Sequence, residues 1–146
     1  MSTGDNMKAV LRRAMKARRR ELAAEAKSAA DAVICEKLKA RTDIGEMVDP
    51  HGFGRPLAVY LASQDEIDID SCVEHMLRAG VKVVVPRWNG ETYELARLNG
   101  LDESCLRRGP MGIREPIDAD VVSPKDVHAW IVPGLAFTRD GKRLGY

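Results

Sequence analysis

The chain has 146 residues and a formal net charge of +1, with 45% hydrophobic and 31% charged residues, the profile of one α/β domain. This composition excludes a disordered protein, and no apolar run approaches the roughly 20 residues that span a membrane. The N-terminus also lacks the apolar core of a signal peptide, so the sequence predicts a cytoplasmic protein without a membrane partner.

The N-terminal segment predicts an amphipathic helix that begins near Asp5 or Asn6, either of which can cap it. Its apolar residues recur at spacings of three and four, at Met7, Val10, Leu11, Ala14 and Met15. Basic side chains fill the other face, because residues 8–20 contain seven Lys or Arg residues and no acid. This end of the chain is therefore expected to attract anions.

A second helix is predicted over Ala24–Lys39, where alanine is frequent and helix propensity is high. Its buried stripe is expected at Ala26, Ala30, Val33, Ile34 and Leu38. The following stretch, from Thr42 to Arg55, is predicted to be a loop, because Pro, Gly and Asp residues interrupt any regular pattern.

The centre of the chain predicts a βαβ unit. Residues 57–62 form a short apolar run typical of a buried strand, and residues 69–79 have helical spacing with Gly80 as a C-terminal cap. A second buried strand is predicted over 81–85 and is expected to stop at Pro86. The crossover between two such parallel strands is nearly always right-handed.

The turn Ser63–Asp68 is the first candidate site, because the carboxyl ends of strands in open α/β sheets bind ligands. Glu66 is the best single candidate there, since a fixed carboxylate can accept hydrogen bonds from an N–H-rich heterocycle. The alternative, which the pattern alone favours, is that the turn caps the next helix through Asp68 or Asp70.

The rest of the chain predicts further strands and turns. A third strand is expected over 93–98, after an Asn89-Gly90 turn, and a fourth over 127–132. Residues 101–124 are expected to be mostly irregular, and Asp140-Gly141 predicts a hairpin turn. Without an internal repeat or a linker, residues 1–146 are expected to form a single domain.

Other candidate anion sites each have a structural alternative. Lys8 and Arg12 share a helix face and can clamp successive phosphates, although the pattern alone favours a solvated face. Arg87 can meet an anion and Trp88 can stack on a ring, or both can simply end a strand. The Gly-rich stretch near the C-terminus can cradle an anion with its backbone N–H groups.

The three cysteines, Cys35, Cys72 and Cys105, lie far apart and have no partner at metal-ligand spacing. They are therefore interpreted as reduced packing residues.

Taken together, these segments resemble the 5-formyltetrahydrofolate cyclo-ligases, also called methenyltetrahydrofolate synthetases. The matching segments are Lys8-Ala-Val-Leu-Arg12, Tyr60-Leu-Ala-Ser-Gln-Asp-Glu-Ile67, Val85-Pro-Arg87, Met111-Gly-Ile-Arg-Glu-Pro116, Val132-Pro-Gly-Leu-Ala-Phe137 and Asp140-Gly-Lys-Arg-Leu-Gly145. Each segment is weak evidence alone, but they occur in family order at family spacing over nearly the whole chain.

The resemblance implies an α/β fold with a mostly parallel sheet flanked by helices, Rossmann-like and of three layers. It also implies that 5-formyltetrahydrofolate is closed to 5,10-methenyltetrahydrofolate in a reaction that consumes ATP and requires magnesium. In that chemistry the formyl oxygen takes the γ-phosphoryl group, N10 attacks the activated carbon, and phosphate leaves. The protein mainly supplies cations and holds the two reactants in line.

The resemblance also assigns residues by position. Lys8, Ala9, Val10, Leu11 and Arg12 would bind ATP, and Arg12 would also lie near the folate. Arg143, Leu144, Gly145 and Tyr146 would open the nucleotide loop. Leu61 and Glu66 would contact the pterin side of the substrate.

The sequence departs from the family pattern at its C-terminal end. Family members continue through a Gly-rich stretch ending in Tyr-Tyr-Asp, and that aspartate and a later one serve as magnesium ligands. Since this sequence contains neither, we expect a domain that lacks its C-terminal part, with weak ATP binding and impaired turnover. We also expect uncovered sheet edges and apolar faces that favour self-association.

Two other functions remain open from the sequence. One is a nucleic-acid-binding module that uses Arg18, Arg19 and Arg20, which the short charge run and the absence of interleaved aromatic residues disfavour. The other is a non-catalytic binding or interaction module derived from the same fold.

Overall fold

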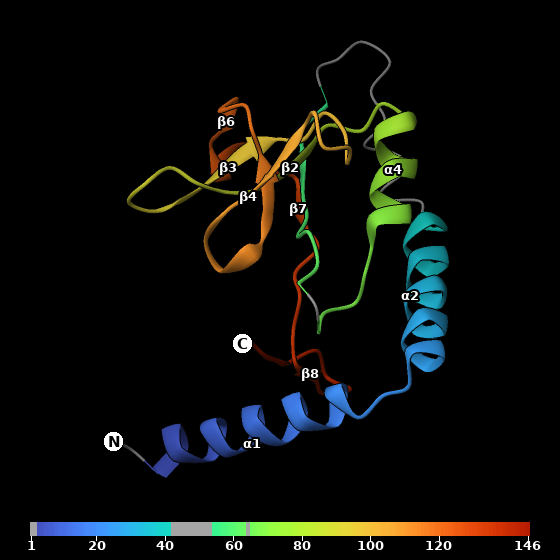
Figure 1. Cartoon of the computed structure of the whole chain (residues 1–146), viewed down its shortest axis with the longest axis vertical. Helices are drawn as coiled ribbons and strands as arrows, with labels where there is room; N and C mark the ends of the chain where they lie inside the picture. Colours follow the sequence, from blue (N-terminus) through green and yellow to red (C-terminus); the bar gives the residue numbers. More distant parts are fainter. Residues whose placement is uncertain (1–2, 42–53, 64) are drawn as a thin grey trace.

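The computed structural model describes residues 3–41, 54–63 and 65–146 (Figure 1). The predicted loop over 42–55 therefore lies outside the described residues except for Gly54 and Arg55. The helices are α1 (Thr3–Arg20), α2 (Ala24–Lys39) and α4 (Asp70–Arg78), with 3₁₀ turns η1 (Pro110–Gly112) and η2 (Pro124–Asp126). The strands are β1 (Leu57–Ala58), β2 (Val83–Trp88), β3 (Tyr93–Arg97), β4 (Leu106–Arg108), β5 (Arg114–Pro116), β6 (Val121–Val122), β7 (Ala129–Trp130), β8 (Ala136–Phe137) and β9 (Arg143–Leu144).

A five-stranded sheet forms the centre of the molecule, in the order β6-β3-β2-β1-β7. Strand β1 pairs in parallel with β2 and with β7, whereas β3 pairs antiparallel with β2 and β6. Helices α2 and α4 pack together beside the sheet (Figure 1). The prediction of an α/β fold whose parallel strand pairs are flanked by helices is therefore confirmed.

The predicted βαβ unit is present as β1, α4 and β2. Leu57 pairs with Val83 and Ala58 with Val84. One face of these strands packs against α2 and α4 in the main buried cluster, which includes Leu57, Val83, Val85, Cys72 and Met76. The opposite face carries a smaller cluster around Ala58 and Val84, as expected when successive side chains of a strand point to opposite faces.

Strand β2 does not stop at Pro86, contrary to the sequence prediction, and continues to Trp88. The carbonyl groups of Lys82 and Val84 accept hydrogen bonds from the N–H groups of Leu57 and Val59, so by alternation Pro86 faces the same side of β2. The ladder of β1 has already ended at Ala58, so the missing N–H of Pro86 breaks no ladder hydrogen bond. On its other side, β2 pairs with β3 as far as Trp88 and Tyr93, which flank the predicted Asn89-Gly90 turn.

Helix α2 has the predicted bounds but not the predicted buried stripe. Its buried residue is Cys35, while Val33 and Ile34 are exposed. The contact face against α4 is narrow, and Cys35 and the half-buried Leu38 occupy it. An alanine-rich helix offers several faces of similar hydropathy, so the periodicity did not identify the one that packs.

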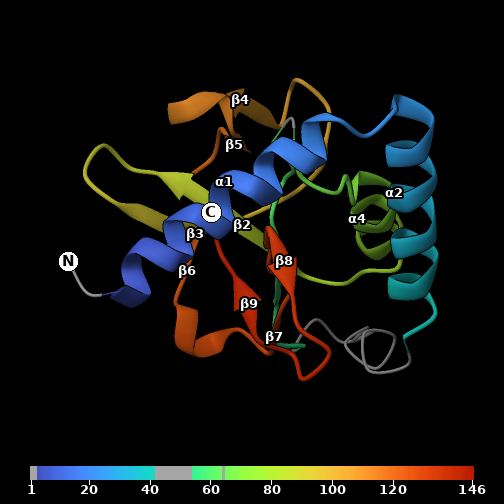
Figure 2. The ribbon, with the colours of Figure 1, turned by 90° about the horizontal axis from the view of Figure 1, so that it is seen from below.

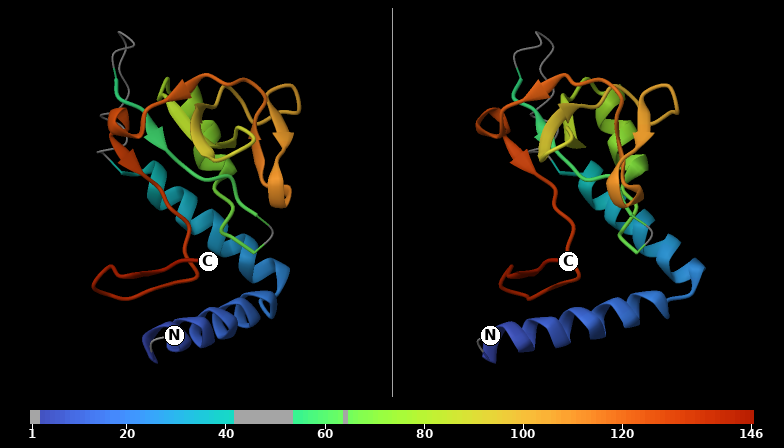
Figure 3. Two further views of the ribbon diagram at one scale, coloured as in Figure 1. Left: turned by 90° about the vertical axis from the view of Figure 1, so that its left-hand side faces the viewer. Right: turned by 60° about the vertical axis from the view of Figure 1, so that its left-hand side comes forward.

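Helix α1 lies apart from the sheet, and the β8–β9 hairpin runs beside it (Figures 2 and 3). The apolar residues expected to face a core remain open, because Met7, Val10 and Leu11 are 62%, 55% and 45% exposed. Among the described residues, α1 is held mainly by polar contacts from Arg12 and Arg19 to the chain after β7.

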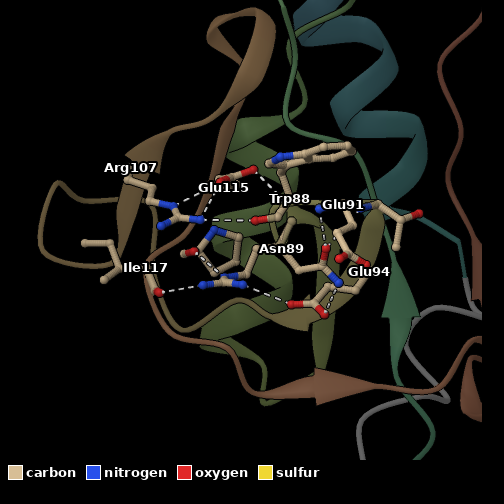
Figure 4. A network of polar contacts seen from close by, with 10 residues as sticks. Trp88, Asn89, Glu91, Glu94, Arg107, Glu115 and Ile117 are labelled. Atoms are coloured by element: carbon tan, nitrogen blue, oxygen red, sulfur yellow. Dashed lines mark hydrogen bonds and ion pairs between the residues drawn. The ribbon is translucent and has the colours of Figure 1, made fainter.

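The β4–β5 hairpin is fixed to β2 by a polar network around one buried carboxylate (Figure 4). Glu115 is 1% exposed and accepts hydrogen bonds from Arg107 Nε at 2.9 Å and from the backbone N–H of Trp88 at 2.9 Å. Arg107 also donates to the carbonyl of Trp88. A buried charge requires partners of this kind, and the network supplies them.

Candidate functional site

The turn that follows β1 is closed by its own hydrogen bonds. Ser63 donates its backbone N–H to Glu66 Oε2 at 2.8 Å, and Glu66 donates its own N–H to the carbonyl of Ser63 at 3.1 Å. Gln64 lies outside the described residues. The carboxylate of Glu66 is therefore held in a defined place in the turn that follows β1 and the extended segment after it.

Two groups outside the turn hold its far end. The phenol of Tyr60 donates to the carbonyl of Ile67 at 2.8 Å, and Asp68 donates its N–H to Asp31 Oδ1 at 3.0 Å. Burial, followed by the nearby charge of Glu66, raises the pKa of Tyr60 well above its usual range. Tyr60 therefore remains a protonated donor at physiological pH.

The two interpretations of this turn apply to different residues. Asp68 Oδ1 accepts the N–H of Asp70 at 2.8 Å, which satisfies a free donor at the start of α4. Glu66 makes no hydrogen bond of this kind with α4 and instead lines two hollows. Asp68 thus supports the start of α4 from one position before the N-cap, Ile69, which itself has no side-chain capping hydrogen bond. Glu66 is left as a candidate ligand-binding residue.

Glu66 lines two neighbouring hollows, and Arg19 and Ile67 line both with it. The larger has a volume of about 190 Å³ and is mostly apolar, with walls that include Tyr60, Ile131 and Phe137. The smaller, of about 100 Å³, lies toward Leu22, Lys27 and Ala30. Glu66 therefore shares its hollows with a cation from α1, which is Arg19.

Arg12 lies on the same face of α1 as Arg19, about two turns earlier. It is half-buried and donates from Nε to the carbonyl of Gly145 at 3.0 Å. The predicted ATP residues Lys8, Ala9, Val10 and Leu11 are exposed along the same helix. Two segments predicted to bind ATP, 8–12 and 143–146, are thus in contact.

The C-terminal residues form a hairpin that returns to α1. Gly141 has a φ of +85° in the predicted Asp-Gly turn, and Leu144 pairs with Ala136 across the β8–β9 ladder. Arg143 donates to the carbonyl of Pro133 at 2.7 Å. The Tyr146 ring lies under Lys16 and Arg19, with distances of 5.6 and 5.8 Å from their charged groups to its centroid.

Leu61 lies in a different environment from the other predicted site residues. It is 3% exposed and belongs to the main buried cluster. None of the hollows described above includes its side chain in its lining.

A third, more polar hollow of about 530 Å³ lies between the start of α4 and the β4–β5 hairpin. Its walls include Ser63, Asp68, Met111 and the ion pair of Asp70 with Arg114. Met111 has a φ of 59°, which is uncommon for a residue other than glycine, and its side chain is 82% exposed at the rim. Arg114 was not among the residues predicted for a site, and Arg19 was named only with Arg18 and Arg20 as a nucleic-acid contact.

The residues Arg87 and Trp88 have structural roles. Arg87 donates from Nη1 to Glu94 at 3.0 Å and from Nε to the carbonyl of Pro116 at 3.2 Å. Trp88 packs edge-on against Tyr93, with ring centroids 5.1 Å apart. Figure 4 shows Trp88 and Glu94 within the network of polar contacts around Glu115. The strand-end interpretation of this pair is therefore favoured over a ligand site.

A magnesium site does not fit the side chains that the structure describes. Within 3–41, 54–63 and 65–146, no three His, Cys, Asp or Glu residues gather closely enough to hold a metal ion. We therefore assign no step of a reaction to magnesium.

In the same part of the chain, no helix is long and apolar enough to cross a membrane.

The sequence model of the 5-formyltetrahydrofolate cyclo-ligase family matches residues 5–146, so the chain belongs to that family. The mouse 5-formyltetrahydrofolate cyclo-ligase is 25% identical over 150 residues, which cover 98% of this chain and 70% of the mouse protein. The resemblance seen in the sequence is therefore confirmed.

Solved structures support the same assignment. The NMR structure of 5,10-methenyltetrahydrofolate synthetase from Aquifex aeolicus matches with a TM-score of 0.80 and 26% identity, covering 96% of this chain and 67% of that one. The Mycoplasma pneumoniae 5,10-methenyltetrahydrofolate synthetase has a TM-score of 0.64 at 20% identity, over 95% of this chain and 71% of that one, and indicates a shared fold.

Proposed function

We propose that this chain acts in the ATP-dependent closure of 5-formyltetrahydrofolate to 5,10-methenyltetrahydrofolate. The observation that carries the proposal is the meeting of α1 with both the turn of Glu66 and the C-terminal hairpin. Arg19 contacts the turn and Tyr146, and Arg12 contacts Gly145. Family membership supports the reaction, and this arrangement supports where its two substrates bind.

In the proposed reaction, the formyl oxygen of the substrate attacks the γ-phosphorus of ATP and ADP leaves. Nitrogen N10 then attacks the activated carbon and loses its proton, and phosphate leaves with the former formyl oxygen as the ring closes. Phosphorylation converts the formyl oxygen, a poor leaving group, into a phosphate ester oxygen that leaves readily. The protein needs to hold two reactants in line and to neutralise phosphate charge.

Arg12 and Lys8 are the cations proposed to bind the triphosphate of ATP. The rest of the proposed ATP site consists of Ala9, Val10, Leu11 and the segment 143–146. An arginine can bind phosphate with two parallel N–H groups, and a half-buried one interacts more strongly with an anion than an exposed one. In this arrangement Arg12 would exchange the carbonyl of Gly145 for phosphate oxygens.

Glu66 is proposed to accept hydrogen bonds from the N–H groups of the pterin, and Leu61 is proposed to contact the same side of the substrate. The contact of Ser63 with Glu66 Oε2 fixes the carboxylate before a ligand arrives. This preorganisation avoids part of the entropic cost of binding. The adjoining apolar hollow offers a surface against which a ring can pack.

Residues 1–146 are proposed to act as one cyclo-ligase-like domain in the cytoplasm, equivalent to 67–71% of the relatives described above. The sequence-based expectations of reduced turnover, of a requirement for magnesium, and of self-association belong to the same proposal. They are tested by comparing this chain with one extended through a Gly-rich loop and a Tyr-Tyr-Asp segment. Sedimentation of the given chain as a clean monomer would count against self-association.

The decisive experiment is calorimetric titration with 5-formyltetrahydrofolate, combined with absorbance detection of the methenyl product when ATP and magnesium are present. We expect folate binding by both chains and faster product formation by the extended one. If neither chain binds the folate, the assignment is rejected.

The structure does not favour the nucleic-acid alternative. Of the three arginines that it requires, Arg19 is committed to contacts within the protein and Arg20 pairs with Asp65 at 3.5 Å. Nucleic-acid binding would be excluded as the function if the protein did not bind RNA, or if its affinity for RNA did not change with salt concentration.

A further inference from the structure

Arg19 contacts more parts of the chain than any other residue in the candidate site. Its Nη1 donates to the carbonyl of Asp65 at 3.1 Å and to the phenol oxygen of Tyr146 at 2.6 Å. Its Nη2 donates to the carbonyls of Gly134 and Leu135, the latter at 3.1 Å. One planar guanidinium therefore joins α1, the turn of Glu66, the chain after β7 and the C-terminal hairpin.

Arg19 lies at both hollows that Glu66 lines. Arg19, Glu66 and Ile67 line both of them, so these three residues lie where the two hollows adjoin. Asp65, whose carbonyl Arg19 binds, directly precedes Glu66 in the chain. A movement of Arg19 is therefore transmitted to the backbone next to Glu66, the residue proposed to bind the folate.

We infer that Arg19 is a positioning residue that couples the folate side of the site, at Glu66, to the nucleotide side, at Tyr146 and Gly145. The inference rests on the proposed function. Binding of a nucleotide against the C-terminal hairpin fixes Tyr146, Tyr146 holds the guanidinium, and the guanidinium holds the turn. Such coupling is reciprocal, so each substrate raises the affinity of the other by the same factor.

The chain offers a matched control in the preceding residue. Arg18 and Arg19 are neighbours on α1 with the same charge, but Arg18 is exposed and about 100° away around the helix. Arg18→Gln and Arg19→Gln therefore change the net charge equally. Arg19→Lys keeps the charge and the aliphatic stem but loses the planar fork, which alone can reach several carbonyls at once.

The first measurement is hydrogen–deuterium exchange of the protein without ligand. We expect faster exchange at residues 65–68 and 134–146 in Arg19→Gln, with an intermediate effect in Arg19→Lys and none in Arg18→Gln. Equal exchange in the two glutamine variants would show that Arg19 does not hold these segments. If Arg19→Gln does not fold, as judged by circular dichroism, Arg19→Lys decides the comparison with Arg18→Gln.

The second measurement is the dissociation constant of 5-formyltetrahydrofolate with and without a saturating non-hydrolysable ATP analogue. We expect the analogue to tighten folate binding about 5-fold or more in the wild type and in Arg18→Gln. The ratio should fall toward one in Arg19→Gln and Arg19→Lys. A merely structural role would weaken binding in both conditions and leave the ratio unchanged, which would overturn the inference.

The two proposals fail in different ways. A wild-type chain that binds neither ligand rejects the proposed function, and the coupling with it, while the exchange data still decide whether Arg19 holds the turn. A wild type that binds both ligands with a ratio of one rejects the coupling alone.

Discussion

Asp70 and Arg114 form an ion pair with two parallel hydrogen bonds, of 2.7 Å from Nη1 to Oδ2 and 2.8 Å from Nη2 to Oδ1. The pair joins the first turn of α4 to β5 and forms part of the wall of the polar hollow. Hydrogen bonding to Asp70 raises the pKa of Arg114, as expected for a close charged partner.

Breaking this pair should lower the free energy of unfolding. We expect Asp70→Asn to cost about 1–3 kcal/mol, because both side chains are half-buried and Arg114 would lose its carboxylate partner. Urea unfolding of Asp70→Asn, Arg114→Gln and the double variant gives the coupling energy. The exposed pair of Glu74 and Arg78 on the same helix is the control, with an expected coupling of about 0.5 kcal/mol or less. Similar coupling in the two pairs would contradict the prediction.

Removing the buried carboxylate of Glu115 should be more costly. We expect Glu115→Ala to lose about 3–5 kcal/mol, since Arg107 and the N–H of Trp88 would lose their partner inside the network. Glu91→Ala, at an exposed position of the neighbouring turn, should stay within about 0.5 kcal/mol. Thermal unfolding of both variants makes the comparison, and equal midpoints would refute it.

A substitution at Gly109 tests the Glu115 carboxylate in a second way. A Cβ atom at this position would collide with both oxygens of Glu115. We expect Gly109→Ala to destabilise the wild type but to have little effect in the Glu115→Ala background, where the collision is absent. A cost that is the same in both backgrounds would show that Glu115 moves aside freely.

The stability of the protein should depend on pH through Tyr60. The pKa of Tyr60 is raised in the folded state by burial first and by the charge of Glu66 second. The folded state therefore binds this proton more tightly, so the contribution is complete below about pH 10, the unfolded value, and declines as pH rises above it. Tyr60→Phe should remove that part of the decline and cost about 1 kcal/mol at neutral pH. Urea unfolding between pH 8 and pH 11 tests this, with Tyr93→Phe as the control.

Cys72 should resist thiol reagents in the folded protein. Its side chain is fully buried, and burial raises the pKa of its thiol to about 11, so little thiolate is present near neutral pH. Mass spectrometry after a short pulse of iodoacetamide should find Cys105, which is half-buried, modified before Cys72. Equal rates at the two positions in native buffer would be inconsistent with this structure.

The fold was predictable where local pattern and tertiary packing agree. The bounds of α2, the βαβ unit and both hairpin turns were predicted because apolar periodicity, Gly and Asn-Gly signals act over a few residues. The β4–β5 hairpin was not predicted, since its strands of three residues are largely charged and lack alternation. Their stability comes from the Glu115 network, which joins residues far apart in sequence.

The candidate site was predictable in part. Glu66 followed from its place at the end of a core strand, and the contact between the segments of Arg12 and Gly145 agrees with their joint assignment to ATP. Arg19 was not predicted to lie beside Glu66, because seven basic residues in one helix look equivalent in sequence. Only the way in which α1 docks decides which of them meets the turn of Glu66 and the C-terminal hairpin.

The polar attachment of α1 has a consequence for how unfolding is observed. A helix whose apolar residues Met7, Val10 and Leu11 stay open loses little hydrophobic burial when it detaches, so it can come away before the sheet melts. Both tryptophans, Trp88 and Trp130, belong to strands of that sheet. Intrinsic fluorescence will therefore miss the departure of α1, whereas far-ultraviolet ellipticity will record it as an earlier transition.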